Sequence, residues 1–235
     1  MPAKVLAVIT ARSGSKGIPN KNMKLMDGKP LIYYTVQEAL KSKTLVKIGL
    51  STDSIDILNY CISLGINENY VRPNHLAGDF VASLPVVQHY VNWQMEANNF
   101  KPDYILLLQP TSPLRLALDI DNSVEKILQF KADSLVSVVE SPHSFVPESI
   151  MKLEGEYLKP FSDSKNIFQR QQKPKYYGRN GAAIYLCSYD CLMNKNSFYG
   201  DSCLAYIMPK ERSIDVDDLL DFEWCEYLIK KRGNA

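Results

Sequence analysis

Short apolar runs alternate with amphipathic segments through the first 140 residues of the chain. The clearest of these runs, at residues 5–9 and 104–108, are continuous apolar stretches, which is typical of strands buried on both faces of a sheet. We expect strands at residues 5–9, 46–51, 66–71, 104–109 and 134–139, and helices near residues 31–40, 55–64, 84–95 and 120–128. This order predicts an α/β fold with a doubly wound, mostly parallel sheet that binds its ligand at the carboxyl ends of the strands.

The pattern changes between residues 141 and 172, which contain Pro, His, Lys and short Tyr/Leu segments without clear periodicity. Beyond residue 141 we expect strands at residues 151–153, 157–160, 182–186 and 205–208 and a final helix from about residue 218 to residue 231. The sequence therefore predicts one domain over residues 1–235 with an insertion at about residues 141–172.

Composition and charge limit the classes of protein that fit. Hydrophobic residues make up 46% of the 235 residues and charged residues 23%, as in an ordinary globular protein. The formal net charge of +1 argues against a nucleic-acid-binding protein. No apolar run is long enough for a membrane span or a signal peptide. The five cysteines show no zinc-site spacing, so we expect free thiols in a reducing, cytoplasmic compartment.

The first predicted strand runs into a long loop that is rich in cations and small residues. Arg12, Lys16 and Lys21 supply positive charge, while Gly14 and Gly17 let the backbone approach a ligand closely. The loop matches neither the Walker A spacing nor the Gly-x-Gly-x-x-Gly fingerprint. It is about twice as long as an ordinary connection between a strand and a helix. We therefore expect it to bind phosphate groups rather than to be a solvated basic loop.

Two further clusters lie where a sheet of this kind binds ligands. Residues 109–115 follow a very apolar predicted strand and combine two prolines with hydroxyl side chains, although such a turn could also be purely structural. Asp215 and Asp217 precede the final helix, and an extended backbone would put both carboxylates on one face. Such a pair suits Mg²⁺ together with substrate phosphates. Alternatively, Asp217 or Asp218 caps the helix.

Three shorter motifs are less specific. Residues 51–53 end a predicted strand and are most simply a helix cap. Arg170 lies in a polar, basic stretch, and Arg179 opens an Arg-Asn-Gly-Ala sequence before an apolar run. The three histidines are widely separated and predict no metal site.

Taken together, these motifs resemble the acylneuraminate cytidylyltransferases, which are the CMP-sialic acid synthetases. The matching segments occur in the family's order and cover nearly the whole chain. They are residues 11–17, 21–22, 51–53, 72–73, 76–79, 109–115, 179–182 and 213–217. The resemblance implies a nucleotide-diphospho-sugar transferase-like fold. It also implies transfer of CMP from CTP to the anomeric hydroxyl of a nine-carbon 2-keto sugar acid, with release of pyrophosphate.

The resemblance also assigns roles to individual residues. Lys21 matches the strongest candidate for stabilising charge in the transition state, and Asp215 and Asp217 match the ligands of a Mg²⁺ cofactor. Asp217 is alternatively a group that helps to deprotonate the sugar hydroxyl. The other matches are Arg12, Ser15 and Lys16 for the CTP phosphates, Asn22 for the nucleotide, Arg72 and Ser83 for cytosine, Gln109 for the sugar, and Arg170 and Arg179 for sugar carboxylate or phosphate.

In one stretch the chain departs from the family pattern. Family members often carry a Lys near residues 141–149 that reaches the sugar site across a dimer interface, and here the nearest Lys is Lys152. Because of this departure, a related nonulosonic acid, such as a legionaminic acid, is an alternative sugar substrate. Because the family dimerises through the region of the predicted insertion, the resemblance also predicts a homodimer with shared active sites.

Other functions stay open at this point. One is a cytidylyltransferase for an eight-carbon keto-sugar acid. Another is a non-catalytic nucleotide-binding module, against which the paired Asp215 and Asp217 argue. A dehydrogenase-type dinucleotide-binding protein is disfavoured because the glycine fingerprint is missing.

Overall fold

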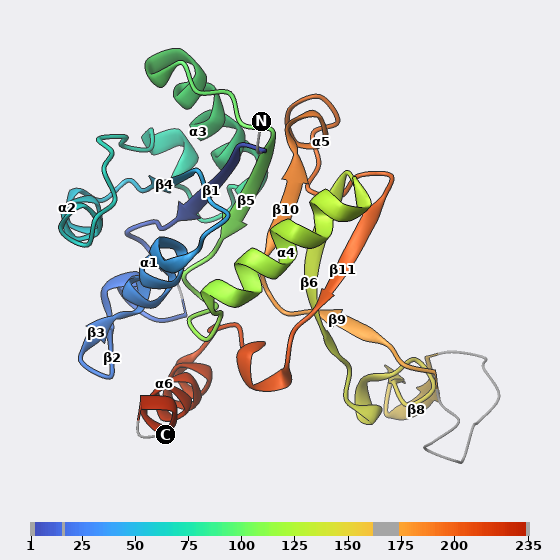
Figure 1. Ribbon diagram of the computed structural model, residues 1–235. Coiled ribbons are helices and arrows are strands. Elements are labelled where there is room, and N and C mark those ends of the chain that lie inside the picture. Colours follow the sequence, from blue (N-terminus) through green and yellow to red (C-terminus); the bar gives the residue numbers. More distant parts are fainter. Residues whose placement is uncertain (1–2, 16, 162–173, 234–235) are drawn as a thin grey trace.

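The computed structural model describes residues 3–15, 17–161 and 174–233, which form a seven-stranded central sheet with helices around it (Figure 1). The strands of this sheet are β1 (Val5–Thr10), β4 (Lys47–Ser51), β5 (Tyr104–Leu108), β6 (Ser134–Glu140), β9 (Tyr177–Arg179), β10 (Tyr185–Ser188) and β11 (Cys203–Ile207). Their order is β11-β6-β10-β5-β1-β4, and β9 pairs with β6. β1 is parallel to β4 and β5, and β11 is parallel to β6, whereas β10 is antiparallel to both of its neighbours.

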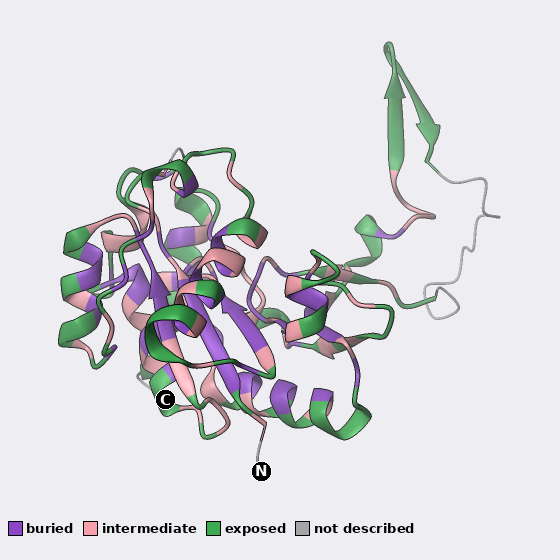
Figure 2. Cartoon of the chain, turned by 90° about the horizontal axis from the view of Figure 1, so that it is seen from above, coloured by how far each residue is buried: buried purple, intermediate pink, exposed green. Residues whose placement is uncertain are grey.

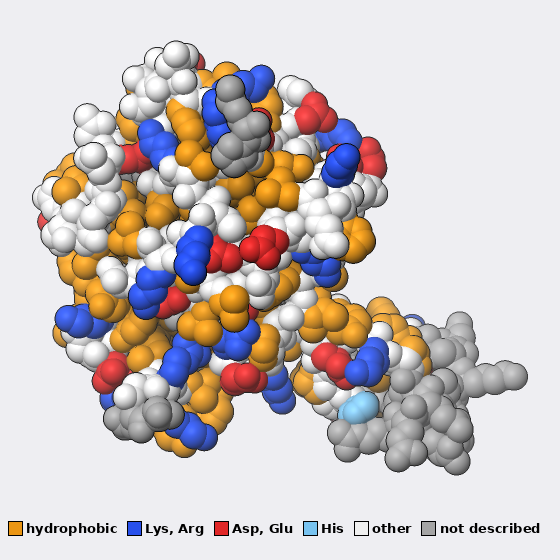
Figure 3. Space-filling model, in the orientation of Figure 1, with side chains coloured by type: hydrophobic (Ala, Val, Ile, Leu, Met, Phe, Trp, Pro, Cys, Tyr) orange, Lys and Arg blue, Asp and Glu red, His pale blue; other side chains and the backbone are white. Residues whose placement is uncertain are grey.

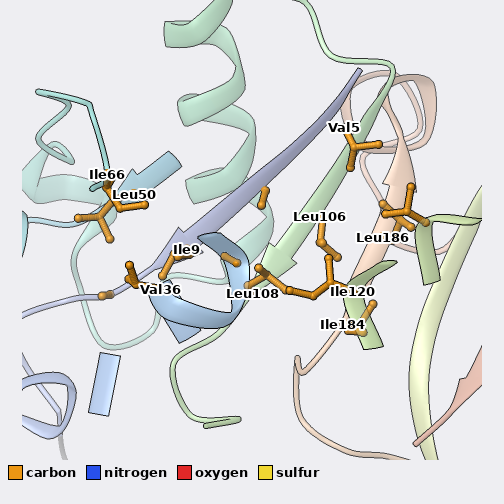
Figure 4. Packing of buried hydrophobic residues seen from close by; sticks show 14 of the residues in the cluster. Val5, Ile9, Val36, Leu50, Ile66, Leu106, Leu108, Ile120, Ile184 and Leu186 are labelled. Carbon is orange, nitrogen blue, oxygen red and sulfur yellow. The ribbon is translucent and has the colours of Figure 1, made fainter. Parts of the chain in front are cut away.

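Helices cover both faces of this sheet because successive strand residues point to opposite sides. The helices are α1 (Leu31–Lys41), α2 (Ile55–Ser63), α3 (Ser83–Asn98), α4 (Ala117–Phe130), α5 (Tyr189–Met193) and α6 (Leu219–Gly233). Ile9 and Leu106 belong to a buried cluster with residues of α1, α2 and α4 (Figure 4). Val8 and Leu107 point the other way and pack with residues of α3 and α5. The predicted doubly wound, mostly parallel sheet is confirmed.

A third apolar cluster lies against α6. Its buried members are Ile18, Met26, Leu31, Leu114, Val216, Phe222 and Cys225. These residues come from the loop after β1, the strand β2 (Leu25–Met26), the start of α1, the turn after β5, the segment before α6 and α6 itself. Burial of this cluster therefore draws together the chain segments in which the sequence predicts site residues.

The segment at residues 66–71 forms no strand, so this prediction is wrong. Ile66 packs in the same cluster as Leu50 (Figure 4), and Tyr70 is buried in the cluster on the other face. These inward side chains account for the apolar pattern without any ladder to the sheet. The next backbone contact is from the N–H of Arg72 to the carbonyl oxygen of Thr52, just past β4. The segment is therefore extended chain held mainly by its side chains.

Several short elements were not predicted. β2 and β3 (Lys29–Pro30) form a hairpin whose connecting residues, Asp27 and Gly28, have φ angles of 47° and 75°. An Asp-Gly pair is a recognised signal for such a turn, but the flanking strands are too short to show alternation. β9 and α5 were also missed. The strand expected at residues 182–186 begins only at Tyr185.

The two strands predicted in the insertion are confirmed as β7 (Met151–Glu154) and β8 (Tyr157–Pro160). Among residues 3–15, 17–161 and 174–233 they pair only with each other, and all eight of their residues are exposed. Figure 2 shows this hairpin projecting away from the body of the chain. In the part of the chain that the structure describes, no helix combines the length and apolar content needed to cross a bilayer.

Candidate active site

A cleft of about 200 Å³ opens at the carboxyl ends of β1 and β5. Thr10, the last residue of β1, and Gln109, the first residue after β5, both line it. The predicted site residues along its wall are Arg12, Ser15, Lys21, Asn22, Arg72, Ser83 and Gln109. The cleft therefore lies at the edge of the sheet where parallel α/β folds bind their ligands.

The loop after β1 is fixed by carboxylates from neighbouring segments. Arg12 forms an ion pair with Asp79. Asp53 accepts hydrogen bonds from the backbone N–H of Ser13 at 2.9 Å and from its hydroxyl at 2.6 Å. Asn22 Nδ2 donates to the carbonyl oxygen of Arg12 at 2.9 Å. These contacts give the loop a defined shape around the cleft.

Residues 51–53 were expected to cap a helix, and the structure corrects this expectation. The cap of α2 is Ser54, whose hydroxyl accepts from the N–H of Ile57 at 3.3 Å. Asp53 instead anchors the first loop through Ser13. No local pattern could predict this contact, because it joins residues forty positions apart.

The inner wall of the cleft carries polar groups with fixed directions. Arg72 is only 4% exposed, and it donates from Nε to the Ser51 hydroxyl at 3.0 Å and from Nη2 to the Ser51 carbonyl oxygen. Burial lowers the pKa of Arg72, and nearby Asp53 opposes this effect. Gln109 Nε2 donates to the Ser83 hydroxyl at 3.2 Å. A wall of this kind can read the polar edge of a base.

The loop after β1 directly contacts the acidic segment, residues 213–218, which carries Asp215 and Asp217. Lys21 Nζ donates to the carbonyl oxygen of Val216 at 2.7 Å, and the N–H of Val216 donates to the carbonyl oxygen of Thr111 at 2.8 Å. Gly17 lies so close to Asp217 that an added Cβ would come within 2.5 Å of the Asp217 carbonyl oxygen. The cationic loop, the turn after β5 and the acidic segment therefore share one site.

Asp215 is a half-buried carboxylate in this junction. Burial is the largest influence and raises the pKa of Asp215; neighbouring Asp217 adds to the rise, while Thr111 and the Lys21 ammonium oppose it. Its Oδ1 atom is buried and has no hydrogen-bond partner among the described residues. Gly181, at φ 68°, packs against it so closely that an added Cβ would lie 2.4 Å from the Asp215 carboxylate carbon.

A hard cation fits this donor set. The unpartnered Oδ1 of Asp215 is a buried anionic oxygen, and the exposed Asp217 carboxylate follows two residues later. The described residues contain no group of three or more His, Cys, Asp or Glu side chains that could hold a metal on their own. Two carboxylates completed by substrate phosphates are a common arrangement for Mg²⁺. The alternative capping role belongs to Asp218, which accepts from the N–H of Asp221 at 3.0 Å.

Five predicted site residues are not among those that line the cleft in the described structure. Two of them, Asp215 and Asp217, adjoin it on either side of Val216, whose carbonyl oxygen accepts from the cleft residue Lys21. Arg179 lies on β9, where its Nη1 donates to the Tyr199 hydroxyl at 2.6 Å. Lys16 and Arg170 lie outside the described residues. The next residue after Arg179, Asn180, is buried and reaches the acidic segment through a 3.1 Å hydrogen bond to the Ser213 hydroxyl.

One residue of the turn after β5 is structural rather than part of the cleft. Arg115 is fully buried and donates from Nη1 to the Ala183 carbonyl oxygen at 2.6 Å and from Nη2 to the Thr35 hydroxyl at 2.9 Å. Burial lowers its pKa to about 10, despite nearby Asp119 and Glu38. Arg115 therefore ties this turn to α1 and to the chain before β10.

Removing the charge of Asp215 should stabilise the protein when no divalent cation is present. Because its folded-state pKa is raised, the folded protein holds this proton more tightly than the unfolded chain, and stability falls as the pH rises through that window. Asp215→Asn should therefore raise the melting temperature at neutral pH in EDTA. The difference from wild type should shrink toward about pH 4, the ordinary Asp range.

The matched control is Asp217→Asn, because the Asp217 side chain is exposed and its neutralisation should change the melting temperature less. Thermal unfolding followed by circular dichroism at several pH values measures both variants. A neutral-pH melting temperature for Asp215→Asn at or below that of wild type would contradict the assignment of an uncompensated buried charge.

Comparisons with known proteins find relatives over nearly the whole chain. A family model described as Cytidylyltransferase matches residues 6–201. The chain is 33% identical over 231 residues to post-translational flagellin modification protein B of Campylobacter coli, covering 98% of this chain and 97% of that protein. It is 33% identical to CMP-N,N'-diacetyllegionaminic acid synthase of Legionella pneumophila over 235 residues, covering 99% of each chain.

A third relative is longer. N-acylneuraminate cytidylyltransferase of Escherichia coli O18:K1:H7 is 34% identical over 235 residues, which are 99% of this chain and 54% of that protein. This chain thus spans about half the length of that relative. Among solved structures, CMP:2-keto-3-deoxy-manno-octonic acid synthetase in complex with CTP superposes with a TM-score of 0.70 at 16% identity, covering 98% of this chain and 100% of that one. That likeness shows a shared fold, and the sequence matches show that this chain belongs to the cytidylyltransferase family.

Proposed function

We propose that this chain transfers CMP from CTP to the anomeric hydroxyl of a nonulosonic acid and releases pyrophosphate. The observation that carries the proposal is the hydrogen bond from Lys21 to the backbone between Asp215 and Asp217. It brings the cationic loop that lines the cleft up to the segment that carries the carboxylate pair, as a metal-assisted reaction of a triphosphate requires. Relatives named for N-acylneuraminate and diacetyllegionaminate activation support the substrate class.

The reaction places specific demands on the cleft. The sugar hydroxyl attacks the α-phosphorus, so negative charge must be stabilised on the phosphate oxygens and on the leaving pyrophosphate. Arg12 and Lys21, both on the cleft wall, are suited to this task, and Ser15 can donate to phosphate oxygens. Lys16 in the same loop is proposed for the same role. We assign Asn22 to the nucleotide, and Arg72 and Ser83 to the cytosine edge.

Asp215 and Asp217 would hold Mg²⁺. The ion would neutralise charge on the triphosphate and polarise the reacting phosphate. Asp215 supplies a buried oxygen that lacks a hydrogen-bond partner among the described residues, and Asp217 supplies an exposed one. As an alternative role, Asp217 would accept the proton of the sugar hydroxyl, since it directly follows Val216, whose carbonyl oxygen accepts from Lys21.

The sugar end of the site is proposed to include Gln109, Arg170 and Arg179. Arg presents a fork that matches a carboxylate, the group common to all sugars of this class. Lys152, the nearest Lys to the position that family members use, lies on the projecting hairpin and pairs with Glu154 at 3.0 Å. This difference, together with the similarity to a diacetyllegionaminate enzyme, favours a legionaminic-type acid as a substrate beside N-acetylneuraminic acid.

The projecting hairpin is best explained by a second copy of the chain. Leu153, Tyr157 and Leu158 on β7 and β8 are 69%, 77% and 65% exposed. Such a group of exposed apolar side chains is typical of a protein interface. We propose that the chain is one domain, that its insertion at about residues 141–172 forms a homodimer interface, and that the dimer works in the cytoplasm. All five cysteines are free thiols, as that compartment favours.

Figure 3 shows Lys and Arg side chains interspersed with Asp and Glu over one face of the molecule rather than gathered by sign. This surface accords with a small charged substrate that is bound locally, in the cleft, where three cationic side chains line the wall: Arg12, Lys21 and Arg72.

Lys21→Ala should lower turnover by about a hundredfold or more, because it removes an oriented charge from the phosphate site. Lys24→Ala is the matched control: Lys24 is an exposed cation three residues away that lies over the Phe222 ring, outside the cleft. Steady-state pyrophosphate release measures both variants, and circular dichroism checks their folding. Unchanged turnover in folded Lys21→Ala would remove this residue from the catalytic assignment.

Substrate choice is tested by pyrophosphate release from CTP with three acids in parallel: N-acetylneuraminic acid, N,N'-diacetyllegionaminic acid and 2-keto-3-deoxy-manno-octonic acid. We expect turnover with at least one of the two nine-carbon acids, little with the eight-carbon acid, and none in EDTA. Preference for the eight-carbon acid would overturn the proposed substrate class. Full activity in EDTA would overturn the metal assignment.

Leu153→Asp should convert the proposed dimer to a monomer, because it places a charge on an apolar side chain that is 69% exposed in one protomer. Phe130→Asp, at the end of α4 and 61% exposed, is the control that should leave the assembly intact. Light scattering gives the mass of each. A monomeric wild-type protein would exclude the proposed dimer. A dimer of unchanged stability in Leu153→Asp would place the interface elsewhere.

A further inference from the structure

A largely buried ion pair, between Arg212 and Asp119, lies just before the acidic segment in the sequence. Arg212 ends the short helical turn Lys210–Arg212 and donates from Nε to Asp119 Oδ2 at 3.0 Å and from Nη2 to Asp119 Oδ1 at 2.8 Å. The side chain of Asp119 is 0% exposed and that of Arg212 is 20% exposed. A two-pronged contact of this kind fixes the direction of the guanidinium as well as its distance.

The pair joins the start of α4, which follows the turn after β5, to the segment that carries Asp215 and Asp217. Asp119 lies in the first turn of α4, and its Oδ2 also accepts from the N–H of Leu116 at 3.0 Å. The same carboxylate therefore fixes the point at which the turn after β5 enters α4. Arg212 lies three residues before Asp215, so its fork ties the start of the acidic segment to that point.

A second tie joins the same two segments further along. The N–H of Val216 donates to the carbonyl oxygen of Thr111 at 2.8 Å. Between the ties, the Ser213 hydroxyl accepts from Asn180 Nδ2 at 3.1 Å and donates to the Pro209 carbonyl oxygen at 2.8 Å. Asp215 is thus held on both sides, with its carboxylate against Gly181.

We propose that Arg212 is a positioning residue for the metal site: through Asp119 it sets where the Asp215 and Asp217 carboxylates stand relative to the turn after β5. This inference rests on the proposed role of those two carboxylates. Arg212 itself is not among the residues that line the cleft. Its effect should therefore appear in cation affinity before it appears in the binding of nucleotide alone.

The alternative is that the pair only stabilises the fold, and Tyr206 on β11 offers a matched control. The Tyr206 hydroxyl donates to the same carboxylate, at Asp119 Oδ1, over 3.1 Å. Tyr206→Phe removes one hydrogen bond from Asp119 but leaves the fork to the acidic segment in place. Arg212→Lys keeps the positive charge but cannot reproduce the fork, and it is less disruptive than a neutral replacement.

The experiment measures binding of Mn²⁺ in the presence of CTP by the electron paramagnetic resonance signal of the protein-bound ion, with melting temperatures in EDTA recorded beside it. Loss of a residue that orients a metal ligand commonly weakens metal affinity by about tenfold to a hundredfold. We expect a shift of that size in Arg212→Lys. We expect wild-type affinity in Tyr206→Phe, even where its melting temperature falls.

The variant Asp217→Ala distinguishes a failure of the proposed metal site from a failure of the positioning role of Arg212. Weakened Mn²⁺ binding in Asp217→Ala with wild-type binding in Arg212→Lys would overturn the positioning role and leave the proposed metal site intact. Equal weakening of Mn²⁺ binding in Arg212→Lys and Tyr206→Phe would show that the ion pair only stabilises the fold. That result would also overturn the inference. Wild-type binding in Asp217→Ala would overturn the metal site and the positioning role together.

Discussion

The geometry of the site depends on how Val216 is held. Its side chain is buried in the same cluster as Ile18 of the first loop and Leu114 of the turn after β5. Its N–H bonds to Thr111 and its carbonyl oxygen accepts from Lys21. One apolar residue therefore locks three loops together, and the carboxylates on either side of it are held next to the loop that lines the cleft. Packing, rather than charge, sets the distance between the cations and the acids.

Within the described part of the chain, this arrangement leaves a buried carboxylate oxygen on Asp215 without a hydrogen-bond partner. Burying such a group costs stability, and the raised pKa of Asp215 expresses that cost. Polar groups left in this state are found at functional sites, where a ligand completes them. A divalent cation and a triphosphate supply the missing charges together, so the cleft is suited to the metal complex of a nucleotide.

Much of the fold could be predicted because periodicity reports burial directly. β1, β5 and β6 are continuous apolar runs, and α1 and α4 bury one stripe each. The same reasoning failed at residues 66–71, where inward side chains of extended chain mimic a strand. The loop, the turn and the acidic pair were found from their side-chain chemistry. Asp53, Asn180 and Arg212 were missed because their roles depend on contacts between residues far apart in the sequence.

The central claim is that one cleft holds the triphosphate between the first loop and the acidic segment. Its most direct measurement is a crystal structure of the protein soaked with CTP and Mn²⁺, with the metal located by its anomalous signal. The account predicts a manganese peak bonded to Asp215 and Asp217 and to a phosphate oxygen, with Arg12 and Lys21 on the same triphosphate. A nucleotide bound elsewhere, or a metal peak remote from both carboxylates, would contradict it.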